Sequence, residues 1–223
     1  MKLAARVGRI TPSPTLAMTA TAKAMAAQGL DVVDFSSGEP DFDTPEPVKA
    51  AAEAAIRAGF TKYTPSSGID ELRQAIIDKF QHEHGLRYEK SQILVSCGAK
   101  HSLYNLAEAF LEAGDEIIIP TPYWVSYADQ ALLNDATPVL LPTSETSGYA
   151  INADDLRRLI TPRTKAIIVN SPCNPTGATY DRKTLEAIAD IAVRHQLLII
   201  SDEIYEKVLY DGATHMSIAT LSP

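Results

Sequence analysis

The sequence predicts an α/β fold with a mostly parallel, doubly wound sheet and flanking helices. From Ser91 onward, short apolar runs alternate with amphipathic stretches of helical period, which is the pattern of repeated βα units. The run at residues 197–200, LLII, has no polar break and is bounded by polar residues on both sides. A short apolar run of this kind is typical of a strand that is buried on both faces of a parallel sheet.

The expected helices follow from the spacing of apolar residues and from Gly and Pro at their ends. They cover residues 15–28, 45–58, 69–85, 100–111, 124–134, 153–160 and 183–194. The strands are expected at residues 31–35, 93–96, 116–119, 138–141, 165–170 and 197–201. We also expect an arm at residues 1–14, loops at residues 36–42 and 62–68, and a domain boundary near residues 44–47.

The composition describes a globular chain with a sizeable core and a net negative charge. Of the 223 residues, 45% are hydrophobic and 22% are charged. The formal charge of −8 argues against a general nucleic-acid or anionic-membrane binder. No apolar run reaches the ~20 residues that span a bilayer, and residues 1–14 lack the apolar core of a signal peptide. With only Cys97 and Cys173, we expect a reducing, cytoplasmic location.

Functional side chains follow four of the expected strands, at the edge where an open α/β sheet binds ligands. Gly98 lies in the turn before the helix at residues 100–111, and free N–H groups at a helix start attract an anion. Most such turns nevertheless bind nothing. Trp124 is the only tryptophan and follows the next strand. It is either a core anchor or a flat face on which a planar ring stacks.

The last two strand ends add an amide, a carboxylate and a phenol. Asn174 lies in a loop dense in turn formers, and its amide can hydrogen-bond a ligand without carrying charge. Asp202 and Tyr205 follow the last strand, where Asp202 either meets a ligand or caps a turn. With Gly98 and Trp124, these residues describe a site for a planar heteroaromatic ring that carries a phosphate and a phenolic oxygen. That ligand is pyridoxal 5′-phosphate (PLP), whose protonated ring nitrogen makes it an electron sink.

Six segments, in the same order along the chain, resemble the class I aminotransferases of PLP fold type I. The resemblance is to the bacterial aspartate and prephenate aminotransferase branch in particular, and it covers nearly the whole chain. The segments are SSGEPDFDTP (residues 36–45), KYTPSSGIDELR (62–73), CGAKHSLYN (97–105), PTPYWVSY (120–127), ITPRTKAIIVNSPCNPTG (160–177) and SDEIYE (201–206).

The resemblance implies a role for each residue that faces the phosphate and the ring. Gly98, Ala99 and Lys100 would hold the phosphate, and Trp124 would stack on the pyridine ring. Tyr63 would reach the phosphate of the neighbouring subunit, because enzymes of this family build each site across a homodimer interface.

The remaining roles concern the polar atoms of the ring and the substrate. Asp202 would pair with the ring nitrogen, while Asn174 and Tyr205 would hydrogen-bond the ring oxygen. Asp202 and Tyr205 are therefore the expected catalytic residues of this chain. Gly38 would lie against the substrate carboxylate, and Trp124 and Asn174 would also face the substrate.

The resemblance also implies how the chain is organised and what it lacks. Residues 1–14 would be an arm, residues 15–46 the first part of a small domain, and residues 47–223 a large domain that is incomplete at its C-terminal end. The Schiff-base lysine of the family and the arginine for the substrate α-carboxylate are expected beyond this sequence. Neither Lys100 nor Lys207 occupies the position of that lysine. We therefore expect the N-terminal portion of a longer enzyme, inactive by itself.

The implied activity is transfer of an amino group between an aspartate-like or related amino acid and a 2-oxo acid. These two substrates and a second subunit are the expected partners, with no nucleic acid or membrane. His82 and His84 complete no metal-ligand spacing, so no metal is expected. Two alternatives share this sequence pattern: a PLP lyase or aminocyclopropane carboxylate synthase of the same fold, and a non-catalytic fragment that acts as an oligomerisation module.

Overall fold

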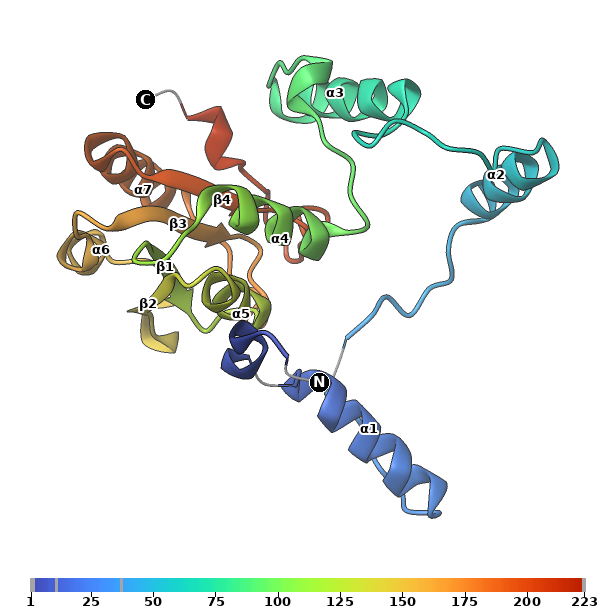
Figure 1. Cartoon of the computed structure of the whole chain (residues 1–223), viewed down its shortest axis with the longest axis horizontal. Coiled ribbons are helices and arrows are strands. Elements are labelled where there is room, and N and C mark those ends of the chain that lie inside the picture. Colours follow the sequence, from blue (N-terminus) through green and yellow to red (C-terminus); the bar gives the residue numbers. More distant parts are fainter. Residues whose placement is uncertain (1–2, 11, 37, 222–223) are drawn as a thin grey trace. The chain divides into compact units, whose positions relative to one another are not determined.

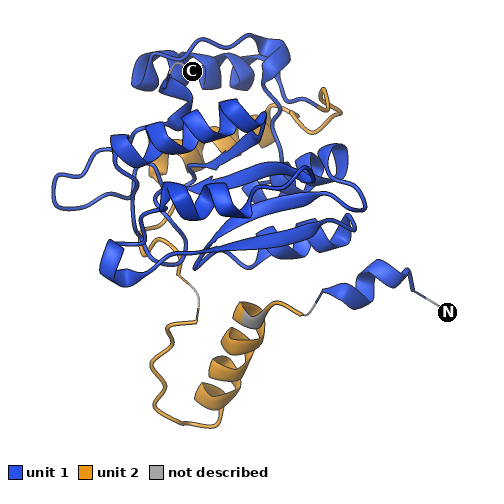
Figure 2. Cartoon of the chain, turned by 90° about the vertical axis from the view of Figure 1, so that its left-hand side faces the viewer, with its two compact units in different colours: residues 1–10, 67–223 blue, residues 11–66 orange. Residues whose placement is uncertain are grey.

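The computed structural model describes residues 3–10, 12–36 and 38–221 (Figure 1). Parts of the predicted arm (residues 1, 2 and 11), of the predicted loop (residue 37) and of the C-terminal end (residues 222 and 223) lie outside the described residues. The chain forms two compact units, one of residues 1–10 and 67–223 and the other of residues 11–66 (Figure 2). The division at residues 14/15 and 46/47 remains a prediction.

The larger unit contains a four-stranded sheet in the order β2-β1-β3-β4, and every neighbouring pair is parallel. The strands are β1 (Glu116–Thr121), β2 (Thr137–Pro142), β3 (Thr164–Asn170) and β4 (Leu198–Asp202). The crossovers contain α5 (Ser126–Leu133), α6 (Ala153–Leu159) and α7 (Arg182–His195). The predicted parallel sheet with flanking helices is thus confirmed. Because the strand order reverses between β1 and β3, their carboxyl ends form the switch point where such sheets bind ligands.

Alternate residues of the strands face opposite sides of the sheet and build two hydrophobic clusters. On one side, Ile117 and Ile119 of β1 pack with residues of α5 and of α4 (Ala99–Phe110). On the other, Ile118 packs with residues of α6 and α7. Figure 1 shows these two helix pairs on opposite faces of the sheet. Each fully buried Ile or Leu contributes roughly 1.5–3 kcal/mol to folding, so β1 and β3 form the centre of the core.

The rest of the larger unit consists of helices around this sheet. They are the 3₁₀ helices η1 (Ala5–Arg9), η2 (Lys90–Gln92), η3 (Glu145–Ser147) and η4 (Ile218–Thr220), and the α-helix α3 (Asp70–His84). The smaller unit contains α1 (Pro14–Ala27) and α2 (Glu46–Arg57). All seven predicted α-helices are present, with ends that lie within two residues of the predicted ones.

Two predicted strands, at residues 31–35 and 93–96, are wrong, since the structure has no strand at either place. An apolar run becomes a strand only where a neighbour completes its hydrogen bonds. At the second run, the Val95 amide donates to the Ser67 carbonyl at 3.0 Å, and this partner belongs to a loop. Gly68 lies close to the same run, because a Cβ atom there would be 2.5 Å from Cγ2 of Val95.

The prediction that the last strand is buried on both faces is also wrong. Only Asp202 of β4 is buried, and Leu198 and Ser201 are exposed. The reason is the strand order, because β4 is an outer strand of the sheet that the described residues form. The same prediction is correct for β1 and β3, whose apolar residues are buried.

Candidate active site

A cavity of about 270 Å³ opens at the carboxyl ends of β3 and β4. It collects residues from the start of α4, from α5 and the loop before it, from the end of β3 and the loop after it, and from β4 and the turn after it. The lining residues are Gly98, Ala99, Lys100, Trp124, Tyr127, Asn170, Asn174, Asp202, Ile204 and Tyr205. Seven of these ten are residues that the sequence predicted for one site.

Asp202 is the last residue of β4, and its side chain is buried at the cavity. The Tyr127 hydroxyl donates to Oδ2 of Asp202 at 2.6 Å, and the Ile204 amide donates to Oδ1 at 3.2 Å. Burial, followed by the negative charge of Asp202, raises the pKa of Tyr127 far above that of a free phenol. Tyr127 therefore stays protonated and donates to Asp202 throughout the physiological pH range.

Asn170 joins three parts of the cavity wall. It pairs with Asp202 in the register of β3 and β4, and its Nδ2 donates to the Asp202 carbonyl at 2.9 Å. Its Oδ1 accepts from the backbone amide of Asn174 at 2.8 Å. The side chain is buried, so its hydrogen bond to the Asp202 carbonyl is shielded from water. Asn170 thus fixes the loop of Asn174 against the strand that carries Asp202.

The start of α4 provides backbone donors at the cavity. Gly98 is the N-cap and has φ +86°, a conformation that favours glycine. No side chain of the described residues caps this helix start. The first N–H groups of the helix are therefore available to an anion beside Gly98, Ala99 and Lys100, and the helix dipole favours negative charge there.

Trp124 forms an aromatic wall of the cavity. Its ring meets the Tyr127 ring edge-on, with the centroids 5.4 Å apart and the planes at 85°. Nζ of Lys100 lies 5.0 Å from the Trp124 ring centroid. Trp124 is half-buried, so part of its indole stays accessible from the cavity. Trp124 also packs against the hydrophobic cluster around Ile119, as a core anchor does, whereas the stacking of a ring on its face remains a prediction.

The sequence matches the family described as aminotransferase class I and II over residues 30–223. This chain belongs to that family. An aspartate aminotransferase of Bacillus sp. (strain YM-2) is 52% identical to it over 220 residues, which are 99% of this chain and 56% of that enzyme. A probable aspartate/prephenate aminotransferase of Aquifex aeolicus is 46% identical, over 99% of this chain and 56% of that protein.

Solved structures of the class I and II family superpose on this chain closely. The aspartate aminotransferase of Thermus thermophilus, solved with maleate, has a TM-score of 0.95 and 46% identity. The match covers 99% of this chain and 57% of that one. An aspartate aminotransferase of Rhizobium meliloti has a TM-score of 0.95 and 43% identity, over 100% of this chain and 56% of that one. This chain therefore spans little more than half the length of these relatives.

Pyridoxal 5′-phosphate is the cofactor of the class I and II aminotransferases, and the donor set of the cavity fits it. A phosphate needs backbone N–H groups, which the helix start at Gly98 offers. A pyridinium N–H needs a charged acceptor, and Asp202 is a buried carboxylate with two neutral donors. A planar ring needs a flat apolar face, which Trp124 presents.

Two residues to which the resemblance assigns a role, Gly38 and Tyr63, belong to the smaller unit. Both are exposed. The predicted role of Tyr63 requires a second subunit, and that of Gly38 requires a substrate. Both roles remain predictions.

Three of the cavity residues had no role in the sequence analysis: Ile204, which lies between Asp202 and Tyr205 along the chain, and also Tyr127 and Asn170. Asn170 ends β3 as Asp202 ends β4, so the rule that identified Asp202 also selects it. Tyr127 follows Trp124 by three residues, and helical spacing puts such residues on one face. Both residues lie in the segments that resemble the class I and II family.

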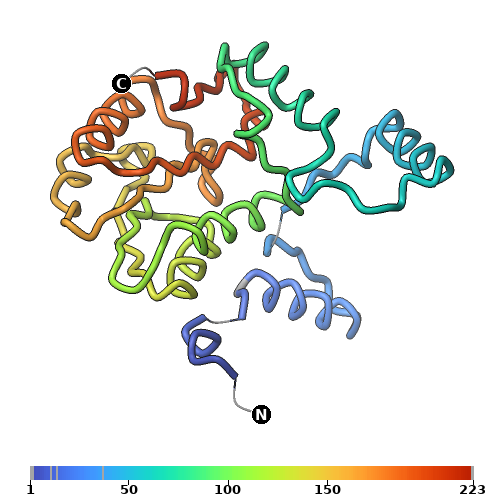
Figure 3. The backbone as a smooth tube through the Cα atoms, turned by 45° about the horizontal axis from the view of Figure 1, so that its top comes forward, coloured from blue at the N-terminus to red at the C-terminus, as the bar shows by residue number. Residues whose placement is uncertain are grey.

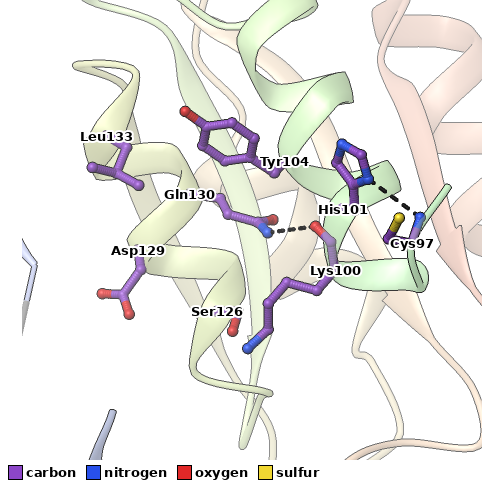
Figure 4. A pocket seen from close by; sticks show the side chains of 8 residues that line it. All are labelled: Cys97, Lys100, His101, Tyr104, Ser126, Asp129, Gln130 and Leu133. Carbon is purple, nitrogen blue, oxygen red and sulfur yellow. Dashed lines mark hydrogen bonds between the residues drawn. The ribbon is translucent and has the colours of Figure 1, made fainter. Parts of the chain in front are cut away.

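A second cavity, of about 430 Å³, lies between α4 and α5 (Figure 4). Nε2 of Gln130 donates to the Lys100 carbonyl at 3.1 Å, and the Cys97 amide donates to Nδ1 of His101 at 3.2 Å. The cavity shares Lys100 with the site, but no strand end reaches it. The candidate active site is therefore the smaller cavity, where the functional groups meet.

Proposed function

We propose that this chain is the cofactor-binding portion of a PLP-dependent aminotransferase that acts on aspartate or a related amino acid and on a 2-oxo acid. The observation that carries the proposal is the meeting of Asp202, Trp124 and the uncapped start of α4 around one cavity. The names of the relatives support the substrate class, because they are aspartate and prephenate aminotransferases.

The proposed role of Asp202 is to keep the ring nitrogen of PLP protonated. PLP supplies an electron sink for a carbanion when its ring nitrogen is protonated. Asp202 would hold a proton on that nitrogen, because a nearby carboxylate favours the positive form of the ring. The Tyr127 hydroxyl and the Ile204 amide orient the carboxylate. Tyr205, whose side chain also lines the cavity, would donate a hydrogen bond to the ring oxygen together with Asn174.

The phosphate and the ring faces would be held by the other lining residues. The backbone of Gly98 and Ala99 and the ammonium of Lys100 would bind the phosphate at the start of α4. Trp124 would cover one face of the ring and exclude water from it. Gly38 would contact the substrate carboxylate, and Tyr63 would reach the phosphate of a second subunit in a cytoplasmic homodimer.

We further propose that the lysine that bonds covalently to the cofactor is supplied from outside residues 1–223, so that this chain alone does not transaminate. Lys100 and Lys207 both have other partners. Nζ of Lys207 lies 2.8 Å from Oε2 of Glu83 on α3, and Lys100 lies against Trp124 at the phosphate end.

None of the helices in the part of the chain that the structure describes has the length and apolar character of a membrane span.

The test is to titrate the 223-residue chain with PLP, reduce the mixture with borohydride, and locate modified lysines by mass spectrometry. We expect saturable binding that competes with inorganic phosphate, without stoichiometric labelling of any one lysine. Pyridoxal, which lacks the phosphate, is the control ligand and should bind more weakly. Site-specific labelling of Lys100 or Lys207 with amino-group turnover would contradict the assignment of the lysine. Absence of saturable PLP binding would contradict the proposed cofactor site.

A further inference from the structure

The turn after β4 carries two kinds of side chain. We call residues 202–206 the β4 exit turn; the Glu206 amide donates to the Glu203 carbonyl within it at 3.0 Å. Asp202, Ile204 and Tyr205 of this turn line the cavity. Glu203 and Glu206 do not line it and bind other parts of the larger unit. Glu203 and Glu206 are therefore sequence neighbours of cavity residues, so a contact that holds either one also restrains the cavity wall.

Glu203 accepts three side-chain hydrogen bonds. The hydroxyls of Ser201 and Ser217 donate to its Oε1 at 2.6 Å and 2.8 Å, and Nε2 of His215 donates to its Oε2 at 2.9 Å. The side chain of Glu203 is only 17% exposed and that of His215 only 7%. Hydrogen bonds to a charged acceptor are the stronger ones, and burial strengthens them further. These contacts join the β4 exit turn to residues 215–217.

Glu206 attaches the other end of the turn to α3. Its carboxylate contacts Nζ of Lys79, and its Oε2 lies 3.0 Å from Nε2 of His84. Figure 3 shows the C-terminal turns of α3 beside the chain that follows β4. Burial by itself would raise the pKa of Glu206, but the hydrogen bonds from Lys79 and His84 outweigh it and lower the pKa. Glu206 is therefore ionised at neutral pH.

The same side chains have the spacing of metal ligands, since oxygen and nitrogen atoms of Glu203, Glu206 and His215 lie within 4.8 Å of one another. Glu206 is already paired with a cation, however, and the oxygens of Glu203 already accept hydrogen bonds. The Lys79 ammonium contacts Glu206, and two hydroxyls and an imidazole donate to Glu203. A cation would have to displace these donors. The geometry thus favours an anchor over a metal site.

We propose that Glu203 is a positioning residue for the cofactor ring. Through Ser201, His215 and Ser217 it fixes the β4 exit turn, so that the carboxylate of Asp202 and the phenol of Tyr205 both face the cavity. The link to Asp202 is direct, because the amide that follows Glu203, that of Ile204, donates to Oδ1 of Asp202. The nature of the ring rests on the proposed function, whereas the anchoring of the turn does not.

The first test needs no ligand. Hydrogen exchange of the 223-residue chain is compared for wild type, Glu203→Ala and the control Glu186→Ala, in which a helix-surface carboxylate paired with Arg182 is removed. We expect the amides of Ile204 and Glu206 to exchange at least about tenfold faster in Glu203→Ala than in wild type, because the variant loses hydrogen bonds to a charged group. The control Glu186→Ala should exchange at these amides like wild type. Exchange in β3 should not change. Unchanged exchange at these two amides would overturn the anchor.

The second test separates ring recognition from phosphate binding by calorimetry with PLP and with inorganic phosphate. We expect Glu203→Ala to raise the Kd for PLP about tenfold and to leave the Kd for phosphate unchanged. Glu203→Gln, which keeps one acceptor oxygen, should recover part of the loss. If the Kd values for PLP and for phosphate rise equally and amides throughout the sheet exchange faster, the variant has destabilised the whole fold, and the inference is overturned.

Two further outcomes are distinguishable. If Glu203→Ala does not fold, Ser217→Ala removes one donor to Oε1 and should give a smaller change of the same kind. If the wild-type chain does not bind PLP, the proposed function fails and the ring-positioning role fails with it. The exchange data then still decide whether Glu203 anchors the turn.

Discussion

Two buried carboxylates lie at opposite ends of the parallel sheet. Glu116 opens β1 and is 6% exposed, whereas Asp202 closes β4 and is 8% exposed. The negative charge of Glu116 is paired with the guanidinium of Arg163, and both of its carboxylate oxygens accept hydrogen bonds. Oε1 accepts from Nε of Arg163 at 2.9 Å and from its Nη2, and Oε2 accepts from the hydroxyls of Thr161 and Thr164 at 2.6 Å and 3.3 Å.

Asp202 has only neutral donors among the described residues, a phenol and a backbone amide, and it borders a cavity. Its negative charge is oriented but not balanced. Burying an unbalanced charge is unfavourable unless a ligand supplies the opposite charge. The comparison shows that burial alone does not distinguish a structural acid from a functional one. The two kinds of acid are distinguished by the charge of their hydrogen-bond partners and by the presence of an adjoining cavity.

The largest effect is expected from Asp202→Ala. Losing the charge-assisted contact to the ring nitrogen should weaken PLP binding by roughly 1.5–3 kcal/mol, which is about tenfold to 150-fold in Kd. Binding of inorganic phosphate should not change, because its donors lie at the start of α4. Calorimetry with both ligands checks this. A PLP affinity equal to that of wild type would remove Asp202 from the site.

Glu116→Gln should leave PLP binding intact and lower the free energy of unfolding by about 1–2 kcal/mol at neutral pH, since the contact with Arg163 loses its charge. The hydrogen bond from Thr161 and the contact with Arg163 together lower the pKa of Glu116 despite its burial. Its contribution is thus complete above the ordinary glutamate pKa, about 4.3, and is lost as the pH falls below that value. Urea unfolding at pH 7 and pH 3 should show the variant converging on wild type in acid.

Tyr127→Phe should have a smaller effect on the site. It removes the donor at 2.6 Å from Asp202 but keeps the aromatic packing, so a loss of about 1 kcal/mol in PLP binding is expected. Tyr123→Phe, in the loop just before α5, is the matched control. Equal affinities for the two variants would show that the Tyr127 hydroxyl does not support Asp202.

The smallest effect on this chain is expected from Tyr63→Phe, because Tyr63 is exposed and its predicted contact is with the phosphate of a second subunit. In the full-length enzyme the variant should retain cofactor less well. Mixed dimers of Tyr63→Phe and Asp202→Ala subunits should contain one intact site and recover activity. Mixtures without recovered activity would place the action of Tyr63 within its own subunit.

Much of the fold could be predicted because the βα pattern is local. The apolar runs of β1 and β3 and the helical periods of α4 and α7 need no knowledge of distant residues. The two wrong strands, at residues 31–35 and 93–96, show the limit of such patterns. A strand depends on a neighbour that completes its hydrogen bonds, and a run of apolar residues does not reveal that neighbour.

In the site, too, local features could be predicted from the sequence, whereas contacts between distant residues could not. Asp202 could be selected from the sequence because it follows the predicted strand at residues 197–201, and Gly98 because it precedes a helix. The contact between Asp202 and Tyr127 joins residues 75 positions apart and depends on the strand order β2-β1-β3-β4. The anchors of Glu203 and Glu206 likewise come from residues 215–217 and from α3. Partners of this kind become visible only once the crossovers are known.

The single tryptophan gives the molecule a built-in optical signal. Because Trp124 is the only indole in the chain and forms a wall of the cavity, all indole emission originates beside Asp202 and Lys100. A ligand that displaces the Lys100 ammonium from the ring face, or that stacks on the ring, changes the surroundings of the whole emitting population. Occupancy of the cavity can therefore be followed in the unlabelled protein, at concentrations far below those that calorimetry needs.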